Sequence, residues 1–206
     1  MRHGERTPLF KETYPKDPYN ESTYEPWGIG QLTNKTMNLT LPEWCTDEVY
    51  RKMQDLMVLE YEIRSYTTQL KRLNGGMLIK KFIDNMNAKS IPRKMYVYSG
   101  HEVNLAAFAR AHNISEPKIP GYGSMFIFEK MRDEESNFYI RIILWTGSTE
   151  KLLTIKLAGC DEICPLKTYL ELVREIIPSD VEVTCLWNNI TREEALALFA
   201  EKLYQN

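Results

Sequence analysis

The chain has 206 residues, of which 43% are hydrophobic and 26% are charged. This composition predicts a single globular domain, residues 1–206, with a continuous core. The net charge of -2 excludes a general electrostatic attraction to nucleic acid or to an anionic membrane. No run of about 18 apolar residues occurs, so neither a membrane span nor a signal peptide is predicted in this sequence. Anion binding must therefore come from a local cluster of charges.

The first such cluster is "MRHGERTP", in which Arg2 and Arg6 flank His3. Guanidinium groups suit the planar recognition of phosphate oxygens, and a neutral imidazole between them is a nucleophile. The alternative is a frayed terminus without a function. Residues 1–42 are rich in Pro, Tyr, Asn, Thr and Gly, which predicts a loop with at most a short helical turn. Loops of this length are usually functional or disordered, and the cluster favours a functional one.

Residues 46–88 predict three amphipathic helices. A β-favouring run from Met95 to Tyr98 follows and leads through a Ser-Gly turn into His101 and Glu102, at the start of an alanine-rich helix. This pattern predicts a strand near the centre of a sheet, with His101 and Glu102 at its carboxyl edge beside helix N-terminal amides that favour anions. The alternative is a pair that only complements the helix dipole.

The rest of the chain completes the predicted fold. The segments 124–131, 137–146 and 151–157 predict a β-meander, and helices are expected at 166–177 and 192–204. His112, late in the alanine-rich helix, is expected to complement the helix dipole rather than to bind a ligand. Together these elements predict an α/β fold, a mixed sheet flanked by helices.

Cysteines and glycosylation motifs indicate an extracytoplasmic protein. In "GCDEICPL" the cysteines Cys160 and Cys164 predict a tight loop closed by a disulfide, although two reduced core thiols are the alternative. No partner can be assigned to Cys45 or Cys185. Five N-x-Ser/Thr motifs predict surface glycosylation in a secreted protein, at Asn20, Asn34, Asn38, Asn113 and Asn189.

Two motifs and their order resemble the histidine acid phosphatases, with the best fit to the secreted insect venom and prostatic-type members. The motifs are "RHGERTP" near the start and "SGHE" at residues 99–102. The stretches "YPKDPY", "GIGQLTN", "LPEW" and "GCDEICPL" stand in the order in which that family has them. The resemblance extends across nearly the whole chain, and it implies a histidine-phosphatase-like fold.

The resemblance also implies a mechanism. His3 would attack the phosphorus of a phosphomonoester to give a phosphohistidine, while Arg2, Arg6 and His101 would bind the phosphoryl oxygens. Glu102 would donate a proton to the leaving alcohol. No cofactor and no metal are expected, and the expected substrate is a small phosphomonoester or a phosphoprotein. A secreted or lysosomal location is expected, and a homodimer is left open.

The sequence departs from the family pattern in three respects. It lacks the strand before R-H-G, so the segment with His3 is expected to have no strand ladder to hold it. It lacks the helical section with a third phosphate-binding arginine, and with it a partner for Cys185. We therefore expect an incomplete domain that exposes apolar surface and hydrolyses phosphomonoesters slowly. The alternative is a catalytically inactive secreted binding protein or a truncated isoform. His3 and His101 are expected within about 10 Å of each other, the reach of one phosphoryl group bound from both sides.

Overall fold

The computed structural model describes residues 1–2, 6–9, 12, 17–32, 40–88, 93–147 and 152–184. Its helices are η2 (Glu21–Tyr24), α1 (Asp47–Ile63), α2 (Thr68–Leu73), α3 (Gly75–Asn87), α4 (Glu102–Ala111), α5 (Leu166–Val173), η3 (Arg174–Ile176) and α6 (Asp180–Thr184). Its strands are β1 (Met125–Arg132), β2 (Phe138–Trp145), β3 (Leu152–Ile155) and β4 (Cys164–Pro165). The predicted α/β class, the short helical turn before residue 42 and the three helices in 46–88 are confirmed.

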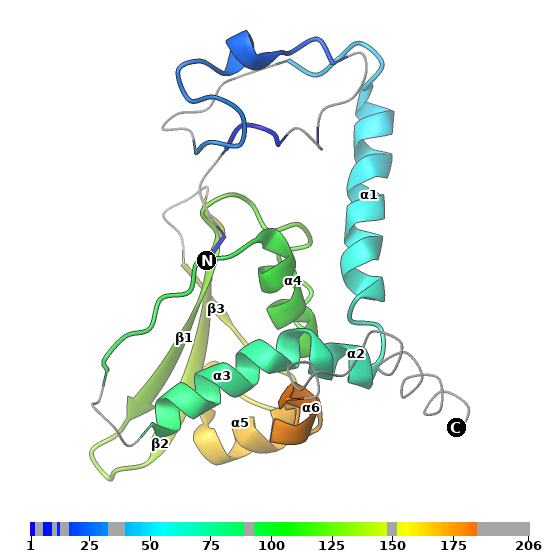
Figure 1. The fold of residues 1–206 in the computed structure, drawn as a ribbon. Coiled ribbons are helices and arrows are strands. Elements are labelled where there is room, and N and C mark those ends of the chain that lie inside the picture. The colour runs from blue at the N-terminus through cyan, green and yellow to red at the C-terminus, as the bar shows by residue number, and fades with distance from the viewer. Residues whose placement is uncertain are drawn as a thin grey trace.

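The strands form one four-stranded antiparallel sheet in which β2 pairs with β1, β3 and β4. The predicted meander is therefore confirmed. Ile140 and Ile142 are two residues apart on β2, so they lie on the same face of the sheet, and both are almost completely buried. They pack in one core cluster with Phe108 of α4, Ile79 of α3 and Tyr169 of α5, so these helices cover that face of the sheet (Figure 1).

The helix α1 stands away from the sheet (Figure 1). Thr46 caps it, because its side chain accepts a hydrogen bond from the Val49 backbone N–H. Tyr61 is buried, whereas Leu56 is 65% exposed and Ile63 is 58% exposed. The expected exposure of apolar surface is thus observed on this helix.

The expected strand from Met95 to Tyr98 is wrong. These residues form no strand, and Met95 and Val97 are 75% and 67% exposed. A β-favouring run becomes a strand only when neighbouring strands satisfy its backbone groups. In the described part of the chain, its backbone hydrogen bonds to another segment are made at its end, where Tyr98 O accepts from the Met1 amino group (2.7 Å) and Gly100 N–H donates to Met1 O (2.9 Å).

The first two residues are held more firmly than the sequence predicts. Arg2 forms an isolated parallel bridge with Gly100, and its backbone N–H donates to Ser124 O at 2.8 Å. Met1 and Arg2 therefore lie between segment 98–100 and the residue that precedes β1. The expectation that no backbone pairing holds this part of the chain is corrected for these two residues.

His112 has a different role from the one predicted. It ends α4 and is only 7% exposed. Its Nδ1 lies 2.9 Å from Phe108 O, and because a carbonyl only accepts, Nδ1 carries the proton. Its Nε2 accepts from the Tyr169 hydroxyl at 3.0 Å. Burial lowers the pKa of His112 to about 4, so the neutral ring cannot complement the helix dipole as a cation.

This buried imidazole makes stability depend on pH. A histidine with a pKa of 6.5 when unfolded and about 4 when folded stabilises the fold fully above pH 6.5. That contribution is lost as the pH falls toward 4 and amounts to about 3 kcal/mol. We expect the pH profile of the unfolding free energy to become flatter by about this amount in His112→Gln, measured by urea unfolding between pH 7.5 and 4. Tyr169→Phe, which keeps the imidazole, should retain the dependence, and parallel profiles for His112→Gln and the unchanged chain would contradict the assignment.

Candidate active site

Arg2 and Glu102 are brought together although they lie far apart in the sequence. Arg2 Nε lies 3.4 Å from Glu102 Oε2, and the two side chains are 15% and 26% exposed. Arg2 Nε has no hydrogen-bond partner, so this contact is an ion pair without hydrogen-bond geometry. The structure thus joins the two predicted motifs at these residues. His3 lies outside the described residues, and the expected distance between His3 and His101 stays a prediction.

His101 and Glu102 stand at the N-terminus of α4, as predicted. His101 is the N-cap residue, and its backbone N–H donates to Asn104 Oδ1 at 2.9 Å. Gly100 is needed for this cap, because a Cβ there would lie only 2.8 Å from Asn104 Oδ1. Glu102 is the acidic residue of the first turn, where free backbone N–H groups favour negative charge. An anion bound beside His101 would benefit from the same groups.

Arg6 is engaged by a carboxylate that sequence reasoning missed. Its Nη1 and Nη2 donate to the two oxygens of Glu12 at 3.0 and 2.7 Å, a bidentate pair. The hydrogen bond with Glu12 is the main cause that raises the pKa of Arg6, and Tyr122 and Glu102 add to it electrostatically. Arg6 therefore shares the electrostatic surroundings of Glu102. A phosphoryl group would have to compete with Glu12 for the Nη1 and Nη2 donors of Arg6.

Thr7 explains why the next motif, "GIGQL", lies beside the first. It is 1% exposed, and its hydroxyl donates to Gly28 O at 2.6 Å. The backbone N–H of Gln31 donates to the same hydroxyl at 3.0 Å, and Arg6 forms an antiparallel bridge with Leu32. These hydrogen bonds fix the backbone on which Arg6 stands.

Three further residues close to Arg2 carried no local signal in the sequence. The Tyr122 ring lies 3.9 Å from the Arg2 guanidinium carbon, and Pro120 O accepts a hydrogen bond from Arg2 Nη1 at 2.5 Å. Ser124 O accepts the Arg2 backbone N–H. The turn-forming composition of "PGYGS" predicts a turn, but nothing in it predicts contact with the start of the chain.

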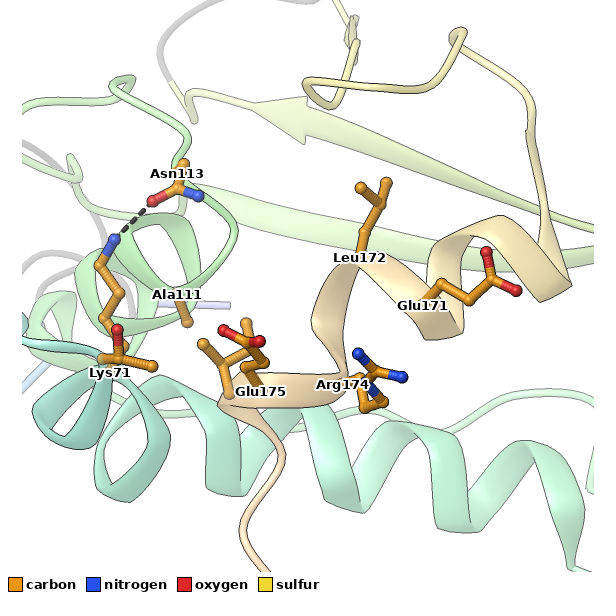
Figure 2. A pocket seen from close by; sticks show the side chains of 9 residues that line it. Lys71, Ala111, Asn113, Glu171, Leu172, Arg174 and Glu175 are labelled. Atoms are coloured by element: carbon orange, nitrogen blue, oxygen red, sulfur yellow. Dashed lines mark hydrogen bonds between the residues drawn. The ribbon is translucent and has the colours of Figure 1, made fainter.

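Two shallow hollows of the described surface lie away from these residues. One, of about 220 Å³, is bordered by α2, the end of α4 and α5, and Figure 2 shows Lys71 donating to Asn113 at its edge. The other, of about 290 Å³, lies between segments 112–116 and 154–158. Neither includes Arg2, Arg6, His101 or Glu102. The chemistry of the charged groups, rather than the depth of a hollow, therefore defines the candidate site.

The other predicted residues are placed as follows. Cys160 and Cys164 form the predicted disulfide, and Cys45 is a buried free thiol. Asn20 and Asn113 are exposed, whereas Asn34, Asn38, Asn189, Cys185 and the helix expected at 192–204 lie outside the described residues. Among the described residues, no cluster of three potential metal ligands occurs. No helix there is both long enough and apolar enough to cross a membrane.

The fold and these contacts define an α/β protein with an arginine and a carboxylate at the N-terminus of one helix, an arrangement suited to a phosphate ester. Residues 19–145 match the model of the histidine phosphatase superfamily (branch 2), and the chain belongs to this family.

Relatives with curated names agree. Venom acid phosphatase Acph-1 of Apis mellifera is 33% identical over 161 residues, which are 75% of this chain and 41% of the relative. Prostatic acid phosphatase of Rattus norvegicus is 28% identical over 72% of this chain and 40% of its own length. Lysosomal acid phosphatase of Xenopus laevis is 30% identical over 73% of this chain and 37% of its own length. The chain thus spans about two-fifths of the length of these relatives.

Proposed function

We propose that the chain is an acid phosphatase that hydrolyses phosphomonoesters through a phosphohistidine. The observation that carries the proposal is the 3.4 Å approach of Arg2 Nε to Glu102 Oε2. It joins the N-terminal motif to the helix that begins at Glu102, and a cation that binds a phosphoryl oxygen there lies beside a carboxyl group that can protonate the leaving oxygen. Membership of the histidine phosphatase superfamily supports the same reaction.

In this proposal the imidazole of His3 attacks the phosphorus, the new P–N bond replaces the P–O bond, and the alcohol leaves with the proton of Glu102. Water then attacks the phosphohistidine, its proton passes to Glu102, and inorganic phosphate is released. Arg2 stabilises the negative charge of the phosphoryl group in both steps, and His101 adds a donor. Arg6 contributes when its guanidinium gives up its hydrogen bonds to Glu12 and donates to the phosphoryl oxygens instead.

Substrate and location are parts of the same proposal. The substrate is a small phosphomonoester or a phosphoprotein, and the location is secreted or lysosomal. The disulfide between Cys160 and Cys164 and the exposed motifs at Asn20 and Asn113 support an oxidising, glycosylating compartment. The names of the relatives refer to venom, to the prostate and to the lysosome.

The test is turnover of p-nitrophenyl phosphate at acidic pH by the purified chain, by His3→Ala and by Arg2→Ala. Both variants should lose at least about a hundredfold in rate, the usual cost of one nucleophile or one positioned donor. Arg51→Ala, on the exposed surface of α1, is the matched control and should keep full activity. Phosphate binding without turnover by the unchanged chain would instead favour an inactive binding protein. Equal turnover by His3→Ala would refute the nucleophile.

A further inference from the structure

The turn that precedes β1 contacts Arg2 in three ways. Pro120 O accepts from Nη1, the Tyr122 ring lies against the guanidinium, and Ser124 O accepts from the backbone N–H. One short segment thus fixes both the backbone and the side chain of Arg2. The Nε atom of Arg2 faces Glu102 at the start of α4.

The turn itself is closed by its own hydrogen bonds. The backbone N–H and the hydroxyl of Ser124 both donate to Gly121 O, at 3.2 and 2.6 Å. Ser124 is fully buried, as is Pro120, whereas Tyr122 between them is 42% exposed. The ends of the turn are therefore anchored in the protein, and its aromatic side chain extends over Arg2 toward the surface.

Contact with an aromatic face restrains a guanidinium differently from a hydrogen bond. A single hydrogen bond to Nη1 leaves the guanidinium plane free to rotate about that contact, whereas a ring 3.9 Å from the central carbon limits that rotation. The orientation of the plane decides where Nε and Nη2 point. Nε is buried and faces Glu102 Oε2 at 3.4 Å, and Nη1 donates to Pro120 O, so the orientation of the plane decides how Nη2 is presented to a ligand.

We propose that Tyr122 is a positioning residue of the phosphoryl site, and that its ring holds the Arg2 guanidinium in the plane that binds a phosphoryl oxygen beside Glu102. The inference rests on the proposed function, because it assigns the ligand of Arg2. The ring contact, not the hydroxyl, carries the role.

Gly147 gives an independent way to move the turn. Its φ is +82°, and a Cβ there would lie 2.3 Å from Tyr122 O and 2.7 Å from Ser124 N. Alanine at this position would push the backbone of the turn away without touching Arg2 directly. Gly147→Ala should therefore have the same effect on the site as removal of the Tyr122 ring.

The experiment measures the dissociation constant of inorganic phosphate by calorimetry and kcat and KM for p-nitrophenyl phosphate. Tyr122→Leu and Gly147→Ala should raise the phosphate dissociation constant and KM by about five- to thirtyfold, with a smaller change in kcat. Tyr122→Phe should stay within about twofold of the unchanged chain, because it keeps the ring. Tyr66→Leu changes an exposed tyrosine in the turn between α1 and α2; it is the matched control and should change nothing.

A double-mutant cycle distinguishes positioning from general destabilisation. In the Arg2→Gln background the further change Tyr122→Leu should alter phosphate affinity by less than about twofold, because its effect passes through Arg2. Additive effects, an unchanged affinity in Tyr122→Leu, or an equal loss in Tyr122→Phe would each overturn the inference. Absence of turnover with intact phosphate binding would refute the proposed function alone. Absence of phosphate binding by the unchanged chain would overturn both.

Discussion

Glu102→Gln is expected to slow the first step with an alkyl phosphate, measured as release of the alcohol in a single turnover, by about 10² to 10⁴-fold, while single-turnover release of p-nitrophenol from p-nitrophenyl phosphate loses far less. The reason is the leaving group. An alkoxide is a poor leaving group and must be protonated as the P–O bond breaks, whereas p-nitrophenolate leaves without much help. Glutamine keeps the size of the side chain but has no acidic proton to give.

The same variant should bind inorganic phosphate at least as tightly as the unchanged chain. When Glu102 is ionised, its charge lies 3.4 Å from Arg2 Nε and opposes a second anion at the same cation, and glutamine removes that charge. Glu62→Gln, at an exposed position of α1, is the matched control. An equal loss in the single-turnover release of both leaving groups would assign Glu102 to positioning rather than to proton transfer to the leaving oxygen. Unchanged turnover on both would leave it as a residue that only complements the dipole of α4.

Those features of the fold that depend on local pattern could be predicted from the sequence. The helical period of residues 46–88 and the alternation in 124–157 correspond to α1 to α3 and to β1 to β3. The disulfide in "GCDEICPL" is also local, since its cysteines are four residues apart. In these segments the neighbours along the chain decide the structure, and tertiary contacts agree with them.

The errors occurred where distant contacts override local preference. Met95 to Tyr98 has the composition of a strand, yet a strand requires pairing partners, and among the described residues these are supplied only at Tyr98 and Gly100. The charge state predicted for His112 is wrong because its burial depends on Tyr169, which lies 57 residues away in the sequence. Long-range packing of this kind leaves no periodic trace.

The candidate site divides in the same way. Arg2, Arg6, His101 and Glu102 are predicted because a motif names them, and their roles stay predictions; the structure brings Arg2 Nε within 3.4 Å of Glu102 Oε2. Pro120, Tyr122 and Glu12 were missed because they act through contacts that no motif recorded. Glu12 is only six residues from Arg6, yet a lone glutamate in a loop rich in charges gives no reason to pair it with one arginine rather than another.

The exposed face of α1 leads to the last prediction, which concerns association. Leu56, Leu59 and Ile63 are 65%, 48% and 58% exposed and are spaced so that they lie on one side of the helix. Contiguous apolar surface of this kind is a site of association or aggregation. We expect the purified chain to self-associate as its concentration rises, as measured by sedimentation velocity.

The triple change Leu56→Gln, Leu59→Gln and Ile63→Gln should weaken this association by at least about tenfold, because each large apolar side chain contributes roughly 1.5–3 kcal/mol when it is buried. Side chains that are already exposed contribute little to folding, so the unfolding free energy should change by less than about 1 kcal/mol. A control with Lys52→Gln and Glu62→Gln alters the same helix but keeps its apolar face, and it should associate like the unchanged chain. Two results together would contradict this prediction: an unchanged chain that stays monodisperse, and a triple variant whose unfolding free energy is several kcal/mol lower. They would mean that this face is packed inside the protein in solution, because polar substitutions lower the unfolding free energy strongly only at buried positions.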